Sequence, residues 1–215
     1  METVGILGGT GPAGQGVGLR LMRAGYDVVL GSRDAERAAT IVAGLDVGGA
    51  TLRGATNEIA SACDVVVVAT PWDSAVSTVT ALREQLSGKI VISMVNALVR
   101  EGRELVPLYP PRGSMAAQLA HALVDSKVVG AFHHLPAAEM MKLDGDLDAD
   151  VVIFSDHADA RTQVGEMVDA MPGLHAVIAG TMSLASAIEA FTAVCISINI
   201  RHKAHSYVKM AGLDH

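Results

Sequence analysis

A glycine-rich segment directly after the first apolar run narrows the possible folds of this chain more than any other feature. The apolar run covers residues 3–7, and the motif G-x-G-x-x-G follows at Gly9, Gly11 and Gly14. A strand that ends in this motif and continues into a helix is typical of dinucleotide-binding domains. Gly9 permits a tight turn, Gly11 lets the backbone approach a pyrophosphate, and Gly14 lets the helix pack close to the strand.

The start of the helix after these glycines is a predicted anion site. Its first N–H groups have no partner within the helix, and the helix dipole presents its positive end there, so both attract phosphate. We therefore expect the phosphates of a dinucleotide over the loop 8–16, which includes Pro12 and Ala13. A glycine-rich turn that binds no ligand is the alternative.

The segment after the second apolar run predicts which dinucleotide binds. An NAD site places an acidic residue about 20 residues beyond the glycines, where it binds the ribose 2′-hydroxyl. This sequence has Ser32 and Arg33 there, with Arg37 one helical turn later. Ser32 can donate a hydrogen bond to a 2′-phosphate, and the arginines can neutralise its charge. We predict NADP; the alternative is a solvated helix start whose arginine pairs with Asp34 or Glu36.

Apolar runs alternate with helical patterns along the chain, which predicts an α/β fold. We expect strands at residues 3–7, 28–30, 51–55, 64–69, 89–93, 128–132, 151–154 and 175–178. We expect helices at residues 14–24, 35–45, 57–62, 74–86, 114–123 and 158–171, followed by a long C-terminal helix. Residues 95–113 contain three prolines and are expected to form loops. The prediction is a Rossmann-type doubly wound parallel sheet over residues 1–134, with a smaller helical or mixed domain over residues 135–215.

Charge and cysteine content exclude several classes of protein. The formal net charge is −7, and no basic cluster of the kind that binds nucleic acid is present. Cys63 and Cys195 lie far apart in apolar runs, which indicates reduced thiols and a cytoplasmic protein. His202 and His205 have metal-ligand spacing, but no third ligand accompanies them, so no metal site is predicted.

One apolar segment, residues 182–200, is nearly long enough to cross a membrane. Glu189 lies near its middle, where a charge opposes insertion by roughly 2.5–3.5 kcal/mol. We therefore expect a helix buried on most sides in a soluble core or in a dimer interface, and no membrane partner.

Five segments together resemble the NADP-dependent oxidoreductases that use coenzyme F420, a deazaflavin hydride carrier. They are GGTGPAGQG at 8–16, GSRDAERA at 31–38, ATPWDSA at 69–75, AFHHLPA at 131–137 and MSLASAIEAFTAVCISINI at 182–200. The resemblance extends over most of the chain. It implies hydride transfer between NADP(H) and F420 in a homodimer.

The resemblance also implies roles for particular residues. It places Thr10 beside the phosphates, and His133 and Leu135 near the deazaflavin ring. The residues it places along the nucleotide after the fourth strand are Thr70, Pro71 and Trp72. We assign Met94 and Asn96, after the fifth strand, to the cofactor site as well, although this segment departs from the family pattern. His134 also departs from it, because some relatives have Thr there.

Hydride transfer requires two stacked rings, exclusion of water and stabilisation of the moving charge, but no strong nucleophile. We expect His133 to donate a hydrogen bond to a carbonyl of the deazaflavin. A histidine that caps a strand end is the alternative, and His134 could take its place. Two other functions stay open: an NADPH-dependent reductase of a flavin, ferric chelate or imine, and an NADP(H)-binding sensor without turnover.

Overall fold

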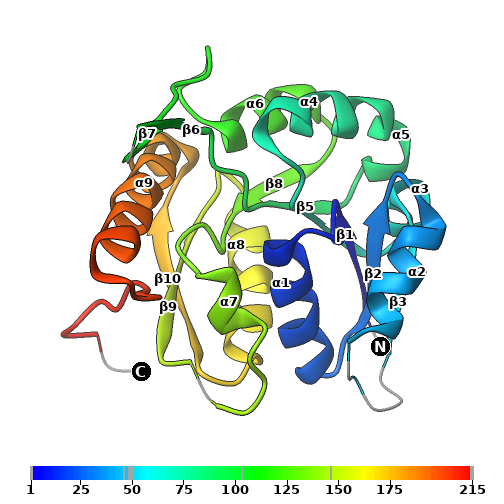
Figure 1. Ribbon diagram of the computed structural model, residues 1–215. Helices are drawn as coiled ribbons and strands as arrows, with labels where there is room; N and C mark the ends of the chain where they lie inside the picture. Colours follow the sequence, from blue (N-terminus) through cyan, green and yellow to red (C-terminus); the bar gives the residue numbers. More distant parts are fainter. Residues whose placement is uncertain (1, 46, 48–50, 103, 146, 214–215) are drawn as a thin grey trace.

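The computed structural model describes residues 2–45, 47, 51–102, 104–145 and 147–213, and within them eight strands form one sheet. The order of the strands across the sheet is β10-β9-β8-β5-β4-β1-β2-β3 (Figure 1). Their bounds are β1 Thr3–Leu7, β2 Asp27–Ser32, β3 Leu52–Thr56, β4 Val65–Val68, β5 Ile90–Ser93, β8 Lys127–Gly130, β9 Ala149–Phe154 and β10 Leu174–Gly180.

The predicted α/β class and the Rossmann-type sheet are confirmed. Six neighbouring strands run parallel, in the order that dinucleotide-binding sheets share: β8, β5, β4, β1, β2 and β3. One end of the sheet departs from the parallel arrangement, because β9 pairs antiparallel with β8 through Gly130 and Phe154. Strands from both sides of residue 134 belong to the same sheet.

Helices cover both faces of the sheet, as the continuous apolar strands require. Val65 and Val67 of β4 face a core shared with α1, α7 and α8, whereas Val66 and Val68 face a core shared with α4, α5 and α6. Figure 1 shows these two layers. The helices are α1 Pro12–Arg23, α2 Ala35–Ala43, α3 Asn57–Ser61, α4 Trp72–Ala81, α5 Arg83–Leu86, α6 Met115–Ala122, α7 Ala137–Met140, α8 Ala158–Asp169 and α9 Ala185–His202.

Local signals explain where several helices begin and end. Asp34 caps α2 by accepting from the backbone N–H of Arg37, and Ser114 caps α6 in the same way. The single helix predicted over residues 74–86 is wrong: Leu82 leaves the helical conformation, with φ −108° and ψ 13°, and divides it into α4 and α5.

The predicted loop region 95–113 is also partly wrong, because it contains a β-hairpin. Strands β6 (Leu98–Glu101) and β7 (Glu104–Pro107) pair antiparallel, with Val99 opposite Val106. β7 packs against α9. The three prolines suggested loop, but this tertiary contact gives the apolar residues of the hairpin a surface to cover.

Helix α9 is less buried than the sequence predicts. The segment Met182–His202 is long and apolar enough to cross a membrane by length and composition, yet only 22% of its most apolar 18 residues are buried within the protomer. Burial on most sides within a soluble core is therefore wrong. Its exposed apolar side chains include Phe191, Val194 and Ile198.

Candidate functional site

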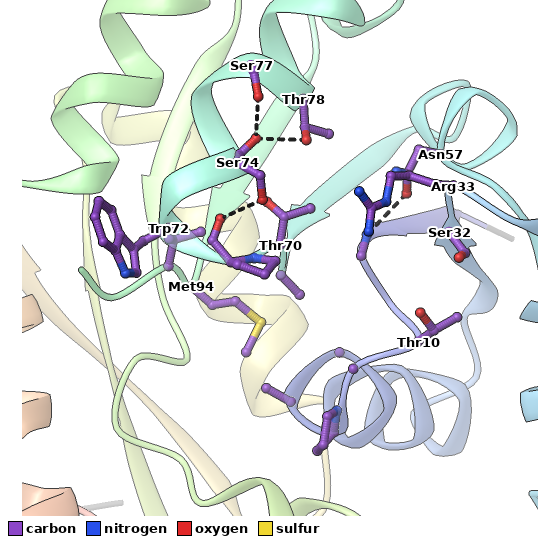
Figure 2. Close-up of a pocket in the computed structure, with 18 of the residues that line it drawn as sticks. Thr10, Ser32, Arg33, Asn57, Thr70, Trp72, Ser74, Ser77, Thr78 and Met94 are labelled. Carbon is purple, nitrogen blue, oxygen red and sulfur yellow. Dashed lines mark hydrogen bonds between the residues drawn. The ribbon is translucent and has the colours of Figure 1, made fainter. Parts of the chain in front are cut away.

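A cavity of about 760 Å³ opens at the carboxyl ends of β1, β2, β4 and β5 (Figure 2). Ligands of open α/β sheets bind at this edge. The structure brings thirteen of the predicted site residues into the cavity wall: Thr10, Gly11, Pro12, Ala13, Gly14, Ser32, Arg33, Arg37, Thr70, Pro71, Trp72, Met94 and Asn96. Gly9, His133 and Leu135 do not line it.

The glycine loop forms the floor of the cavity and the start of α1. A Cβ on Gly14 would lie 2.7 Å from the Cα of Gly9, so the loop and the helix touch through backbone alone. A Cβ on Gly11 would meet no protein atom nearer than 3.6 Å. Packing within the protein therefore requires glycine at position 14, whereas position 11 is open toward the cavity. Pro12 occupies the first helical position, and no acidic residue lies in the first turn.

Ser32 lies at the end of β2 with its hydroxyl beside the cavity. Its Oγ accepts a 3.2 Å hydrogen bond from the backbone N–H of Asp34, which leaves the hydroxyl hydrogen available to an acceptor in the cavity. Arg33 and Arg37 are exposed beside it. Among the described residues, the side chain of neither arginine forms an ion pair with Asp34 or Glu36. The ion pair that the alternative interpretation of this segment predicts is therefore not observed.

The opposite wall comes from the end of β4 and the first turns of α4. Sequence reasoning identified Thr70 and Trp72 here but missed Ser74, Ser77 and Thr78. The hydroxyls of Ser77 and Thr78 donate to the carbonyl of Ser74, at 2.9 and 2.8 Å (Figure 2). Their spacing of three and four residues places them on one face of the helix, a signal that was available in the sequence.

Asn57 is a further cavity residue that sequence reasoning missed. It is the first residue of α3, directly after β3, and its Oδ1 accepts a 3.1 Å hydrogen bond from the backbone N–H of Gly8. Its position after a parallel strand was the signal that could have identified it, because such residues gather at the carboxyl edge.

His133 follows β8 and is buried, with 5% of its surface exposed. Its ring stacks on that of Phe154, with centroids 5.4 Å apart, and neither ring nitrogen has a hydrogen-bond partner within the described chain. Burial and the neighbouring His134 lower the pKa of His133 to about 3, so the ring is neutral at pH 7. The residue before it, Phe132, has a φ of +66°, a strained conformation for a bulky side chain.

Asn96 connects the cavity to α9 and to the segment after β8. Its Nδ2 donates to the carbonyl of His133 at 3.3 Å, and its Oδ1 accepts from the hydroxyl of Thr192 at 3.0 Å. The same hydroxyl lies 3.3 Å from the His133 carbonyl. Asn96 therefore touches the cavity while both ends of its amide are held by protein.

His134 points away from the cavity toward α9. Its Nε2 lies 2.7 Å from the carbonyl oxygen of Ile188, and its ring meets the ring of Phe191 edge to face. Burial lowers its pKa. His134 therefore links α9 to the segment after β8, and it does not line the nucleotide cavity.

Within the described residues, no three His, Cys, Asp or Glu side chains group as metal ligands. Cys63 and Cys195 are free and buried, and burial raises the pKa of both thiols.

Comparisons with known proteins show what this chain is similar to. A family model described as "NADP oxidoreductase coenzyme F420-dependent" matches residues 3–97. A protein named F420-dependent NADP reductase from Methanothermobacter marburgensis is 31% identical over an alignment of length 211, which covers 93% of this chain and 93% of that protein. A protein of the same name from Methanocaldococcus jannaschii is 32% identical over an alignment of length 215, which covers 94% of this chain and 94% of that protein.

Solved structures share the fold over nearly the whole chain. A crystal structure from Arthrobacter sp. FB24, described as a candidate F420-dependent NADP reductase, superposes with a TM-score of 0.83 at 22% identity. The match covers 96% of this chain and 97% of that one, and at this identity it concerns the fold alone.

Proposed function

Since the chain belongs to the family of NADP oxidoreductases that depend on coenzyme F420, we propose that it transfers a hydride between NADP(H) and this deazaflavin. The observation that carries the proposal is the composition of the cavity. A helix N-terminus, a hydroxyl donor at Ser32 and two arginines without acidic partners in the described chain surround one space at the carboxyl edge. This arrangement suits a dinucleotide with an additional phosphate.

The residues present fit NADP(H). The glycine loop and the first turn of α1 would hold the pyrophosphate, and Ser32, Arg33 and Arg37 would hold the 2′-phosphate. Trp72 and Met94 line the cavity beyond β4 and β5, where the nicotinamide would lie. The two coenzymes supply the hydride chemistry, and the chain binds them, orients them and keeps water away from them.

We assign the polar contact with the deazaflavin to His133. Buried polar atoms almost always have a hydrogen-bond partner, so two ring nitrogens without one indicate a partner from outside the described chain. Because the lowered pKa keeps the ring neutral, one nitrogen donates and the other accepts. Leu135, two residues later, is half-buried and would form apolar surface beside the ring. Residues 135–215 would form the remainder of the deazaflavin site.

We further propose that the enzyme is a homodimer formed through α9. Four exposed apolar residues of this helix follow a spacing of three and four residues, namely Ala187, Phe191, Val194 and Ile198, and Leu184, directly before the helix, continues the pattern. This spacing is typical of a helix that packs against another helix. A second protomer on this face would cover the apolar surface without a membrane. The net charge of −7 does not favour binding to nucleic acid. We place the enzyme in the cytoplasm, where its two buried thiols stay reduced.

One mixing experiment tests the reaction. NADPH is added to the protein with oxidised F420, and the absorbance of the deazaflavin is followed. We expect its loss, together with oxidation of NADPH. Retained NADPH binding without any loss would contradict the proposal and leave a nucleotide sensor. Turnover with a flavin, ferric chelate or imine in place of F420 would identify a different reductase.

A further inference from the structure

The side chain of Asn57 crosses one strand of the sheet to reach another. Asn57 follows β3, and the group it binds, the N–H of Gly8, follows β1, while β2 lies between them. The crossing is possible because the β2 residue beneath it is Gly31, whose Cβ would lie 2.8 Å from the Asn57 Oδ1. Glycine at position 31 thus provides the space for this amide.

The hydrogen bond to Gly8 fixes the orientation of the amide group. A backbone N–H only donates, so the atom of Asn57 that faces Gly8 is the oxygen, and the Nδ2 group occupies the other side. No residue of the described chain accepts a hydrogen bond from Nδ2, and this nitrogen is not among the buried polar atoms without partners. Since Asn57 lines the cavity, its two N–H donors face the space that the nucleotide would fill.

Asn57 lies between the two predicted phosphate sites. On one side is the start of the glycine loop at Gly8, and on the other are Ser32 and Arg33, level with the end of β3 through the pairing of Ser32 with Thr56. Figure 2 shows Asn57 beside Arg33, on the same side of the cavity as Ser32 and Thr10. In NADP(H), the group that joins the 2′-phosphate to the pyrophosphate is the adenosine ribose.

We propose that Asn57 is a binding residue for the adenosine ribose, with Nδ2 donating to the 3′-oxygen while Oδ1 holds the glycine loop. An acidic residue at the end of β2 serves the ribose hydroxyls in NAD sites. Ser32 stands there in this chain and would face the 2′-phosphate, so the 3′-hydroxyl would need another partner. This inference rests on the proposed NADP(H) site, but not on the identity of the hydride acceptor.

The test compares two ligands that differ by one hydroxyl. Dissociation constants of NADP⁺ and of its analogue without the adenosine 3′-hydroxyl are measured by calorimetry for the wild type and Asn57→Ala. We expect the wild type to prefer NADP⁺ by about three- to tenfold, the value of one neutral hydrogen bond. Asn57→Ala should bind both ligands equally. An equal preference in both proteins would overturn the contact with the 3′-oxygen, even if the variant binds more weakly throughout.

Asn57→Asp separates the two roles of the amide, and serves if the alanine variant does not fold. The carboxylate keeps an acceptor for Gly8 but offers no donor and repels phosphate. We expect its melting temperature to match the wild type, while its affinity for NADP⁺ falls about tenfold or more. Unchanged affinity would overturn the proposal. Because these measurements use binding alone, a wild type that binds NADP⁺ but leaves F420 unreduced would contradict only the proposed reaction.

Discussion

The carboxylate of Glu189 accepts a 2.7 Å hydrogen bond from the backbone N–H of Met115, and a second one of 2.9 Å from the N–H of Ala116. Glu189 lies in the second turn of α9, and the two donors are at the start of α6, so a side chain of one helix caps the other. The charge that argued against a membrane span in the sequence thus has a defined structural partner. Burial raises the pKa of this carboxyl from 4.5 to about 7.

This shift predicts a pH dependence of stability. The folded state holds the Glu189 proton up to a higher pH than the unfolded state does, so the free energy of unfolding decreases as pH rises from 4.5 to about 7, and is constant above. The size is on the order of 3 kcal/mol. Urea denaturation of the wild type and Glu189→Gln across this range measures it. We expect the difference in unfolding free energy between the two proteins to change with pH. His133 titrates in both proteins, so its contribution cancels in this difference, and a difference that stays constant would contradict the pKa shift of Glu189.

Arg33 should determine the preference for NADPH over NADH. Its guanidinium lies beside Ser32 at the predicted 2′-phosphate site and has no acidic partner in the described chain. We expect Arg33→Ala to raise the KM for NADPH roughly 10- to 100-fold, since a charge-assisted hydrogen bond is lost. The KM for NADH, which lacks the phosphate, should stay the same. An equal increase for both cofactors would indicate a structural role.

Two glycines of the loop should respond differently to alanine. Gly11→Ala places its Cβ in free space 3.6 Å from the nearest protein atom, so the melting temperature should not change while NADPH affinity falls. Gly14→Ala places its Cβ 2.7 Å from the Cα of Gly9, so stability should fall as well, by about 1–3 kcal/mol. Thermal melts and NADPH titrations of both variants check this. Full affinity in Gly11→Ala would show that no ligand approaches the loop there.

The nucleotide half of the site could be read from the sequence because its signals are local. The glycines come directly after β1, and Ser32 and Arg33 are adjacent at the end of β2, so each group marks a strand end at the binding edge. The parallel strands were equally clear, because a run such as Val65–Val68 is apolar on both faces.

The rest of the site depends on contacts between distant segments. Asn57 meets Gly8 over 49 positions, and Thr192 meets Asn96 over 96. The position after a strand could have placed Asn57 at the binding edge, but no periodicity or spacing identifies which residues such side chains contact. The β6–β7 hairpin was missed for the same reason, because β7 packs against α9 from the far end of the chain.

His133 should act as a neutral hydrogen-bonding group toward F420. With its pKa lowered to about 3, it does not titrate between pH 5 and 9, and we expect no step from this residue in the pH profile of kcat/KM. We expect His133→Ala to lower kcat/KM for F420 roughly 10- to 100-fold with the KM for NADPH unchanged. Steady-state kinetics with each substrate varied separately make the comparison. Unchanged turnover and F420 affinity would remove the assignment.

The exposed face of α9 should hold two protomers together. Val194 is 47% exposed and Ile198 44%, and they lie one helical turn apart in the apolar stripe of α9. We expect Val194→Glu to convert the dimer into a monomer, because a carboxylate buried at such an interface would have no partner. Sedimentation velocity measures the mass, and circular dichroism verifies that the fold is kept. Thr162→Glu, at an exposed position of α8 outside this stripe, is the control for added charge. A wild type that sediments as a monomer, or a Val194→Glu variant that stays dimeric, would show that α9 is not the interface.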